Sequence, residues 1–346
     1  MKTCTKCQRI YRTDEDFLFD TEKWRVGADG ALYFECSCQA TQFLPKGSYQ
    51  WYSPSRFLRN EVLEIFKSLG LGEMIPSPPA ELIALRSACN DMTLSTSELA
   101  AIVKKEPVIC SDLLRMSDVV AARRGNKIRT VEHAIAYVGR RTVADLLGLA
   151  ALRSRVFVTK EFKSEVFWRE ALTCGVIAEE LTASHPSHLS PDEAYIAGCL
   201  CNIGKAIGAI CYAEVTDRVF LRSERDQLTW SAAEKIEEAV DHAILGEIAS
   251  VMWCMPRFVT DTSAFHHSMK FENLPSRKHR GMIVIGLANQ ITHAVLNQNH
   301  RIDRGLAERF CDAIGQSSDS SITLENLVER CAPLVRIAEQ ALGQGT

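Results

Sequence analysis

The sequence has no strong excess of charge of either sign and no long apolar run. It carries 40 Lys and Arg against 43 Asp and Glu, a formal net charge of -3, so no overall field draws it to nucleic acid or an anionic membrane. The apolar stretch GMIVIGLANQITHAVL is interrupted by Asn289, Gln290 and His293, and a span needs roughly 20 apolar residues. The start MKTCTKCQRI has no apolar core of a secretion signal. We therefore expect a cytoplasmic protein for which neither a membrane nor nucleic acid is the expected partner.

The sequence also lacks internal repeats and low-complexity tracts, and its cysteines are unevenly placed. Of the 13 cysteines, four are grouped as Cys4-Thr-Lys-Cys7 and Cys36-Ser-Cys38. The others lie singly in apolar helical patterns, where a reduced thiol packs as a small hydrophobe. Between the two pairs, Asp29-Gly30 separates alternating segments and predicts a hairpin, which would bring both pairs together.

Four thiolates at one point would complete a tetrahedral structural zinc site. Zinc would also explain how a segment of about 50 residues, too short for a strong core, is ordered. Reduced surface thiols or a single disulfide are the alternatives. The segment resembles a zinc ribbon, although C-x-C replaces the second C-x-x-C. Its few basic residues are offset by Asp14, Glu15 and Asp16, so we interpret it as a structural or protein-docking module.

After residue 50 the apolar residues recur with helical periodicity, and no strand pattern of comparable length appears. Ser95 with Glu98 forms a capping box, and SPDE at 190–193 combines an N-cap serine with proline at the first helical position. IPSPP at 75–79 marks a boundary. Helices are expected near 79–90, 96–105, 107–121, 130–138, 140–155, 163–184, 191–201, 204–225, 231–254, 257–266, 278–298, 304–315 and 323–343.

Several stretches in the helical region match one family in order and spacing. They are IPSPPAEL, LAAIVKKEPVICSDLLRMSD, KIRTVEHAIAYVGRRTVADLL, FWREAL and AYIAGCLCNIGK. As a set they resemble an HDOD domain over residues 75 to about 300. This family is related to the HD-superfamily metal-dependent phosphohydrolases and usually occurs in bacterial signalling proteins.

The expected fold class is mainly α, an all-helical HDOD/HD-like domain preceded by a small β zinc-ribbon-like module. We divide the chain into the module at 1–47, a linker and helix at 48–74, the N-terminal helical part of the HDOD domain at 75–158, an HD-like part at 159–300 and C-terminal helices at 301–346.

The resemblance implies that active HD enzymes hold metal with a His on one helix, an adjacent His-Asp pair and a distant Asp. This chain has Glu170 at the first position, Cys201 and Asn202 at the pair, and Asn289 at the last. An ion that activates water needs imidazole nitrogen and carboxylate oxygen, and two neutral amides remove negative charge. We therefore expect no catalytic residues and no catalytic metal.

Four further residues belong to the vestigial HD-type site that the resemblance outlines. His242, His266 and His267 stand where two-metal relatives would use them. They could hold a remaining ion or bind phosphate, but we favour hydrogen-bonded polar residues of an inherited fold. Lys205 either contacts a phosphate or begins the next helix.

We predict a non-catalytic bacterial signal-transduction or scaffolding protein whose partner is another protein of a signalling pathway, with a nucleotide as an alternative ligand of the old pocket. One rival is a metal-dependent phosphohydrolase or phosphodiesterase acting on a nucleotide or cyclic dinucleotide, with Glu170 and the three histidines as ligands. Another is a nucleic-acid-binding regulator that uses the ribbon and the basic stretch AARRGNKIR at 121–129.

Overall fold

The computed structural model describes two compact units of the chain, Met1–Ile75 with Phe271–Ser276, and Pro76–Lys270 with Arg277–Thr346. The described residues are 2–4, 6, 8, 10–11, 21–26, 32–36, 38, 40–44, 80–105, 110, 113–117, 121, 128–153, 155, 157–253, 255–269, 276–315 and 323–342. Cys7, the side chain of Cys36, the turn at Asp29-Gly30, the linker helix and most of the basic stretch 121–129 lie outside this description.

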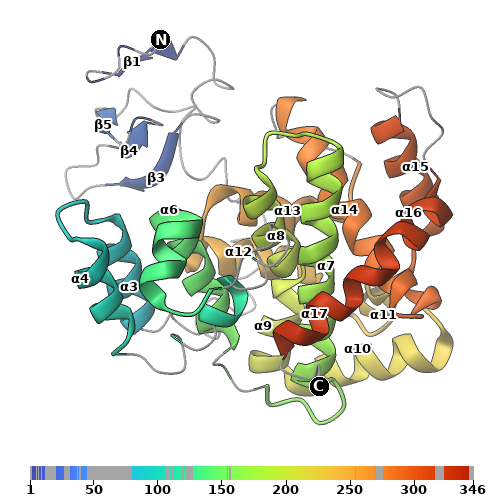
Figure 1. Ribbon diagram of the computed structural model, residues 1–346. Coiled ribbons are helices and arrows are strands. Elements are labelled where there is room, and N and C mark those ends of the chain that lie inside the picture. The colour runs from blue at the N-terminus through green and yellow to red at the C-terminus, as the bar shows by residue number, and fades with distance from the viewer. Residues whose placement is uncertain are drawn as a thin grey trace. The chain divides into compact units, whose positions relative to one another are not determined.

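The N-terminal unit contains short antiparallel strands (Figure 1). β1 (Lys2–Thr3) pairs with β2 (Ile10–Tyr11). In a second sheet, β4 (Leu32–Cys36) lies between β3 (Thr21–Val26) and β5 (Thr41–Leu44). Val26 pairs with Leu32 and Thr21 with Cys36, so the two strands of the expected hairpin are present and antiparallel.

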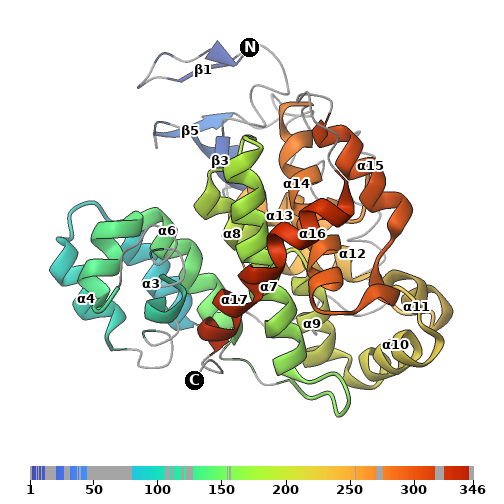
Figure 2. The same ribbon diagram turned by 45° about the vertical axis from the view of Figure 1, so that its right-hand side comes forward.

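The second unit is built from helices, as Figures 1 and 2 show from two directions. Its first helices are α3 (Ala80–Asn90), α4 (Thr96–Val103), α6 (Val131–Arg153), α7 (Ser164–Ser184) and α8 (Pro191–Leu200). They are followed by α9 (Ile203–Cys211), α10 (Ala213–Asp226), α11 (Trp230–Ile236), α12 (His242–Met252), α13 (Arg257–Phe265) and α14 (Ser276–Val295). A 3-10 turn, η3 (Asn299–Arg301), precedes α15 (Arg304–Gly315), α16 (Leu324–Cys331), the 3-10 turn η4 (Ala332–Leu334) and α17 (Val335–Leu342).

Local sequence signals place several helix ends where they were expected. Ser95 and Glu98 form the predicted capping box at the start of α4, with Glu98 accepting the Ser95 N–H at 2.7 Å. Ser190 and Glu193 form the second one before α8. Gly139 interrupts α6 with φ +84°, a conformation that glycine adopts readily, and it separates the two helices predicted on either side of residue 139.

Two of the expected helices were wrong, because each is a pair of helices, and the helix expected at 323–343 is divided into α16 and α17 by η4. The helix expected at 204–225 is broken at Tyr212, whose φ of -130° and ψ of 46° are not helical. The helix expected at 231–254 ends at Ile236, and Glu238 adopts φ +52° before α12 begins at His242. Apolar periodicity continues across both breaks, so it could not reveal them. The second break places the imidazole of His242 at the start of a helix.

Glycines allow close approaches at the centre of the helical unit. A Cβ on Gly198 of α8 would lie 2.8 Å from the Cα of Gly175 in α7, so the two backbones touch there. A Cβ on Gly204 would lie 1.8 Å from the carbonyl oxygen of His242. Only glycine allows α9 and α12 to approach so closely, and this contact places the end of α8 beside His242.

One stretch, Pro191–Cys211, is long and apolar enough to cross a membrane, contrary to our expectation that no run reaches that length. The structure divides it into α8 and α9, and 89% of the apolar window is buried inside the unit. This burial is what the core helices of a globular domain show, so the stretch is no evidence for a membrane protein.

Candidate functional site

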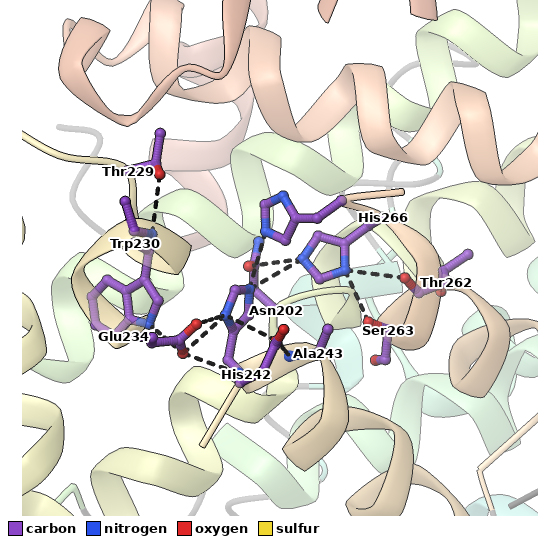
Figure 3. Close-up of polar contacts among 12 residues, drawn as sticks. Asn202, Thr229, Trp230, Glu234, His242, Ala243, Thr262, Ser263 and His266 are labelled. Carbon is purple, nitrogen blue, oxygen red and sulfur yellow. Dashed lines mark hydrogen bonds and ion pairs between the residues drawn. The ribbon is translucent and has the colours of Figure 1, made fainter. Parts of the chain in front are cut away.

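Side chains from several helices and helix ends meet in the interior of the helical unit (Figure 3). Asn202 lies between α8 and α9, Asn289 lies in α14, and His242 begins α12. His266 and His267 follow the end of α13. The structure thus joins the predicted HD-pair position with all three predicted histidines through direct contacts.

The three imidazoles point their Nε2 atoms toward one another. Nε2 of His242 lies 3.3 Å from Nε2 of His266 and 3.1 Å from Nε2 of His267. The ring centroids of His266 and His267 are 4.0 Å apart. His242 and His266 are almost fully buried. Side chains from two places in the sequence therefore form one compact group, which contains enough nitrogen donors for a metal ion.

The opposite nitrogens of two rings have fixed partners, as the dashed lines of Figure 3 show. Nδ1 of His242 lies 3.0 Å from both carboxylate oxygens of Glu234 in α11. Glu234 also accepts the backbone N–H of His242 and Nε1–H of Trp230, each at 3.0 Å. Nδ1 of His266 lies 2.9 Å from the carbonyl oxygen of Ser263. Since a carbonyl only accepts, Nδ1 of His266 carries the proton and Nε2 presents its lone pair to the cluster.

Burial keeps these imidazoles neutral. It lowers the pKa of His242 to about 3. Burial also lowers the pKa of His266 and of His267 well below the usual value, and the neighbouring rings and the Lys205 ammonium add to the shift. The same desolvation raises the pKa of Glu234 to about 8. Neutral imidazoles are the form that binds metal ions, so protons compete weakly for these nitrogens near neutral pH.

At the HD-pair position the structure shows an amide pair. Nδ2 of Asn202 donates to Oδ1 of Asn289 at 2.7 Å, and Oδ1 of Asn202 lies 3.3 Å from Nε2 of His266. Cys201 is buried, and its thiol donates to the carbonyl of Gly198 at 3.2 Å. The two amides hold each other by a hydrogen bond between the positions that the resemblance gives to metal-binding carboxylates.

Glu170 and Lys205 belong to a neighbouring group of buried charges. Glu170 is 5% exposed and pairs with Arg301, while Gln298 donates to it at 3.0 Å. Burial alone would raise the pKa of Glu170, but Arg301 and then Lys205 outweigh it, and the pKa lies below its usual value. Burial lowers the pKa of Lys205, which Glu170 partly opposes. The Lys205 ammonium lies 4.9 Å from the centre of the Trp230 ring.

The three histidines are suitable ligands for a metal ion, whereas Glu170, Asn202 and Asn289 are not suitable for holding a catalytic one. Glu170 is bound by a cation, and Asn202 and Asn289 lack the charge that holds a water-activating dication. The three histidines fit an ion, because neutral imidazoles are good ligands for Zn²⁺ and similar ions. The chain supplies three imidazole nitrogens as ligands, and the carboxyl of Glu234 supports His242 from behind. An ion held there would polarise whatever molecule occupied its fourth coordination position.

Three residues of these clusters were not predicted from the sequence: Glu234, Trp230 and Arg301. Glu234 and Trp230 lie in a helix that was expected to run on into α12, which hid the turn that brings Glu234 beneath His242. Arg301 lies 131 residues from Glu170, and an isolated arginine in a polar stretch gives no signal of a buried ion pair.

In the N-terminal unit, the structure describes two of the four cysteines predicted to bind zinc. Cys4 is buried, and its Sγ lies 3.6 Å from Sγ of Cys38, which is half-buried. The two thiols are free. One cysteine of each predicted pair thus lies beside the other, while the turn and the other two thiols lie outside the described residues.

Comparison with known proteins identifies the family of the helical unit. The model of the HDOD domain family matches residues 75–269. An uncharacterized protein of Treponema pallidum (strain Nichols) is 23% identical over 196 residues, which are 56% of this chain and 38% of that protein. The chain thus spans well under half of the relative's length.

Solved structures show the same fold. An HDOD domain protein of unknown function from Geobacter sulfurreducens aligns with a TM-score of 0.57 at 18% identity, over 77% of this chain and 92% of its own. A candidate phosphohydrolase from Shewanella amazonensis SB2B aligns with a TM-score of 0.58 at 18% identity, over 83% and 98%. A candidate signal transduction protein from Marinobacter aquaeolei VT8 aligns with a TM-score of 0.59 at 14% identity, over 91% and 75%. At these identities the likeness concerns the fold alone.

Proposed function

Because this chain belongs to the HDOD domain family, we propose that it is a non-catalytic signal-transduction or scaffolding protein that acts by binding a protein partner. The observation that carries this proposal is the hydrogen bond of 2.7 Å between Nδ2 of Asn202 and Oδ1 of Asn289. Two amides joined by one hydrogen bond stand where a hydrolytic centre needs carboxylates. A metal ion at this point would have to break that bond and would gain no charged ligand in return.

The surrounding charges support the same conclusion. Glu170 is already paired with Arg301, and Lys205 is buried beside them. A dication added to this group would be repelled by two buried cations, at short range and in a medium that screens charge poorly. A weakly held ion cannot lower the pKa of a bound water enough to generate a nucleophile. We therefore expect the helical unit to act by presenting its helix surfaces to a protein partner.

A hydrolysis assay tests this proposal. The purified full chain is incubated with linear and cyclic dinucleotides and with a chromogenic phosphodiester, in the presence of Mn²⁺ or Zn²⁺. We expect no product above the metal-only blank. A His242→Ala variant purified in the same way reports contamination, because an impurity acts equally in both samples. Metal-dependent turnover by the wild type that disappears in this variant would overturn the proposal and restore the phosphohydrolase hypothesis.

We also propose a structural zinc ion in the N-terminal unit, held by Cys4, Cys7, Cys36 and Cys38. The separation of 3.6 Å between Sγ of Cys4 and Sγ of Cys38 supports it, because ligands about 2.3 Å from a tetrahedral zinc lie roughly 3.8 Å apart. Zinc content per chain is the measurement. We expect Cys4→Ser to lose one equivalent and Cys110→Ser, which changes a half-buried thiol of the helical unit, to lose none. Equal zinc content in all three proteins contradicts the site.

The nucleotide ligand, the cytoplasmic location and the expectation of no nucleic-acid partner stay predictions.

A further inference from the structure

We infer that His242, His266 and His267 form a mononuclear site for one divalent ion of the zinc class, which ties α12 to the end of α13 without hydrolysing a substrate. The inference goes beyond the proposed function, which needs no ion in the helical unit. Zn²⁺, Co²⁺ and Ni²⁺ are the candidates, because ions of intermediate softness prefer imidazole nitrogen, whereas Mg²⁺ and Ca²⁺ prefer oxygen.

The spacing of the nitrogens matches the coordination geometry of zinc. Imidazole nitrogens bind zinc at about 2.0–2.1 Å, so two of them at tetrahedral angles lie about 3.3–3.4 Å apart. The observed separations are 3.3 Å from His242 to His266 and 3.1 Å from His242 to His267. The imidazoles therefore need little movement to bind one ion, and the binding energy is not spent on ordering three free side chains.

The partners behind the rings are those of a metal site. A metal-binding histidine usually gives its other N–H to a carboxylate or a backbone carbonyl, which fixes the tautomer and the ring orientation. His242 has the carboxylate of Glu234 at 3.0 Å, and His266 has the carbonyl of Ser263 at 2.9 Å. His266 thus directs an Nε2 lone pair into the cluster, and His242 does so when Glu234 is ionised and accepts its Nδ1–H. For His266 the carbonyl partner leaves no other assignment while the ring is neutral.

The amide oxygen of Asn202 offers a fourth ligand for the ion and explains why the site would not activate water. Its Oδ1 lies 3.3 Å from Nε2 of His266, the same separation as between the two imidazole nitrogens. An amide oxygen there would take the position that an activated water needs. On the far side of that amide stands Asn289, whose buried Nδ2 has no hydrogen-bond partner among the described residues. No carboxylate at these two positions remains to position a second ion.

The opposite orientation of the two asparagine amides would make a metal ion unnecessary, so the test has to distinguish the two orientations. If both amides turned over, Nδ2 of Asn202 would donate to Nε2 of His266, and Nδ2 of Asn289 would donate to Oδ1 of Asn202. The exchange of nitrogen and oxygen in an amide preserves its shape. The lone pair of His266 would then be satisfied by a hydrogen bond, and the cluster would need no ion.

Metal titration of the full chain decides between them. A Cys4→Ser, Cys38→Ser background removes thiol ligands of the N-terminal unit, and Co²⁺ is the probe because its visible spectrum reports tetrahedral nitrogen and oxygen ligands. We expect one equivalent of Co²⁺ to bind, to give a tetrahedral spectrum without a thiolate charge-transfer band, and to be displaced by Zn²⁺. Separate His266→Gln and His267→Gln variants should each bind at least tenfold more weakly. Glu234→Gln should weaken binding by about 10- to 100-fold.

Two matched histidine variants serve as controls. His293→Gln changes a buried histidine of α14 whose Nδ1 bonds Gln298, and His133→Gln changes an exposed one in α6. Both should bind Co²⁺ like the background protein. Circular dichroism identifies variants that fail to fold. Glu234→Gln keeps the size of the side chain, so it gives a second comparison if a histidine variant is unfolded.

The outcomes separate this inference from the proposed function. Stoichiometric binding that needs the three histidines, without phosphodiester turnover, supports both. Binding with turnover supports the site as an ion site but overturns its inertness and the proposed function together. Absence of tetrahedral Co²⁺ binding by folded background protein, or equal binding by the His266→Gln and His293→Gln proteins, overturns the inference and leaves the proposed function intact.

Discussion

The buried ion pair between Glu170 and Arg301 allows a quantitative test of the claim that Glu170 serves structure. Glu170 is 5% exposed, so its charge cannot be solvated if Arg301 is removed, whereas Arg301, which is 4% exposed, also pairs with Glu224. Breaking a buried pair from one side costs about 3–5 kcal/mol, because a charge stays behind unpaired. Gln298 still donates to Glu170 at 3.0 Å and Lys205 lies nearby. We therefore expect Arg301→Leu to cost about 3 kcal/mol, the lower end of that range.

A double variant makes the argument specific. In Glu170→Gln, Arg301→Leu the stranded carboxylate is gone, Gln298 can still bond the amide at residue 170, and Lys205 keeps Glu234 as a neighbouring carboxyl group. We expect the double variant to be more stable than Arg301→Leu by about 1–2 kcal/mol, since a buried pair replaced on both sides loses less than one broken on one side. Urea unfolding of the full chain, followed by far-ultraviolet circular dichroism and by tryptophan fluorescence, gives the free energies of unfolding. A loss below about 1 kcal/mol in Arg301→Leu, or a double variant less stable than it, refutes the reasoning.

Two further predictions concern the elements around the site. Gly204→Ala should destabilise the protein by about 3 kcal/mol, the upper end for overpacking, because its Cβ would lie 1.8 Å from the carbonyl oxygen of His242. Gly305→Ala is the control and should not destabilise the protein, because its Cβ would meet nothing closer than 3.6 Å. Thermal unfolding of both variants measures the difference. Asp261 is buried between two cations, with Lys278 at 2.8 Å, and although burial alone would raise the pKa of its carboxyl, the cations hold it below the usual value. Its stabilisation should be full above pH 5 and lost as the pH falls below about 4, so the difference in unfolding free energy between wild type and Asp261→Asn should narrow on acidification, and a difference that grows there contradicts the ion pair.

Features that depend on neighbouring residues were predictable from sequence. The capping boxes at Ser95 and Ser190, the two strands of the hairpin and the separation of α6 at Gly139 each follow from a few adjacent side chains and the backbone angles they allow. The gathering of Asn202, the histidines and Asn289 was implied by a family resemblance rather than by periodicity, and the contacts between them agree with it.

Features that depend on tertiary contacts were not predictable. The breaks at Tyr212 and Glu238 occur where apolar periodicity continues, so the local pattern carries no signal of either one. The pairing of Glu170 with Arg301 and of Glu234 with His242 joins residues whose types fit a solvated helix surface equally well. The bond between the two asparagines was equally hidden, since the sequence shows only the loss of two carboxylates and not what the amides do instead.

We propose a closed hydrolytic centre beside a histidine cluster that can hold one ion. Anomalous scattering from crystals grown with zinc tests this most directly, because it locates each ion without reference to activity. We predict one peak in the helical unit, between Nε2 of His242, His266 and His267. A peak between Glu170, Asn202 and Asn289, with or without the first, would contradict the account.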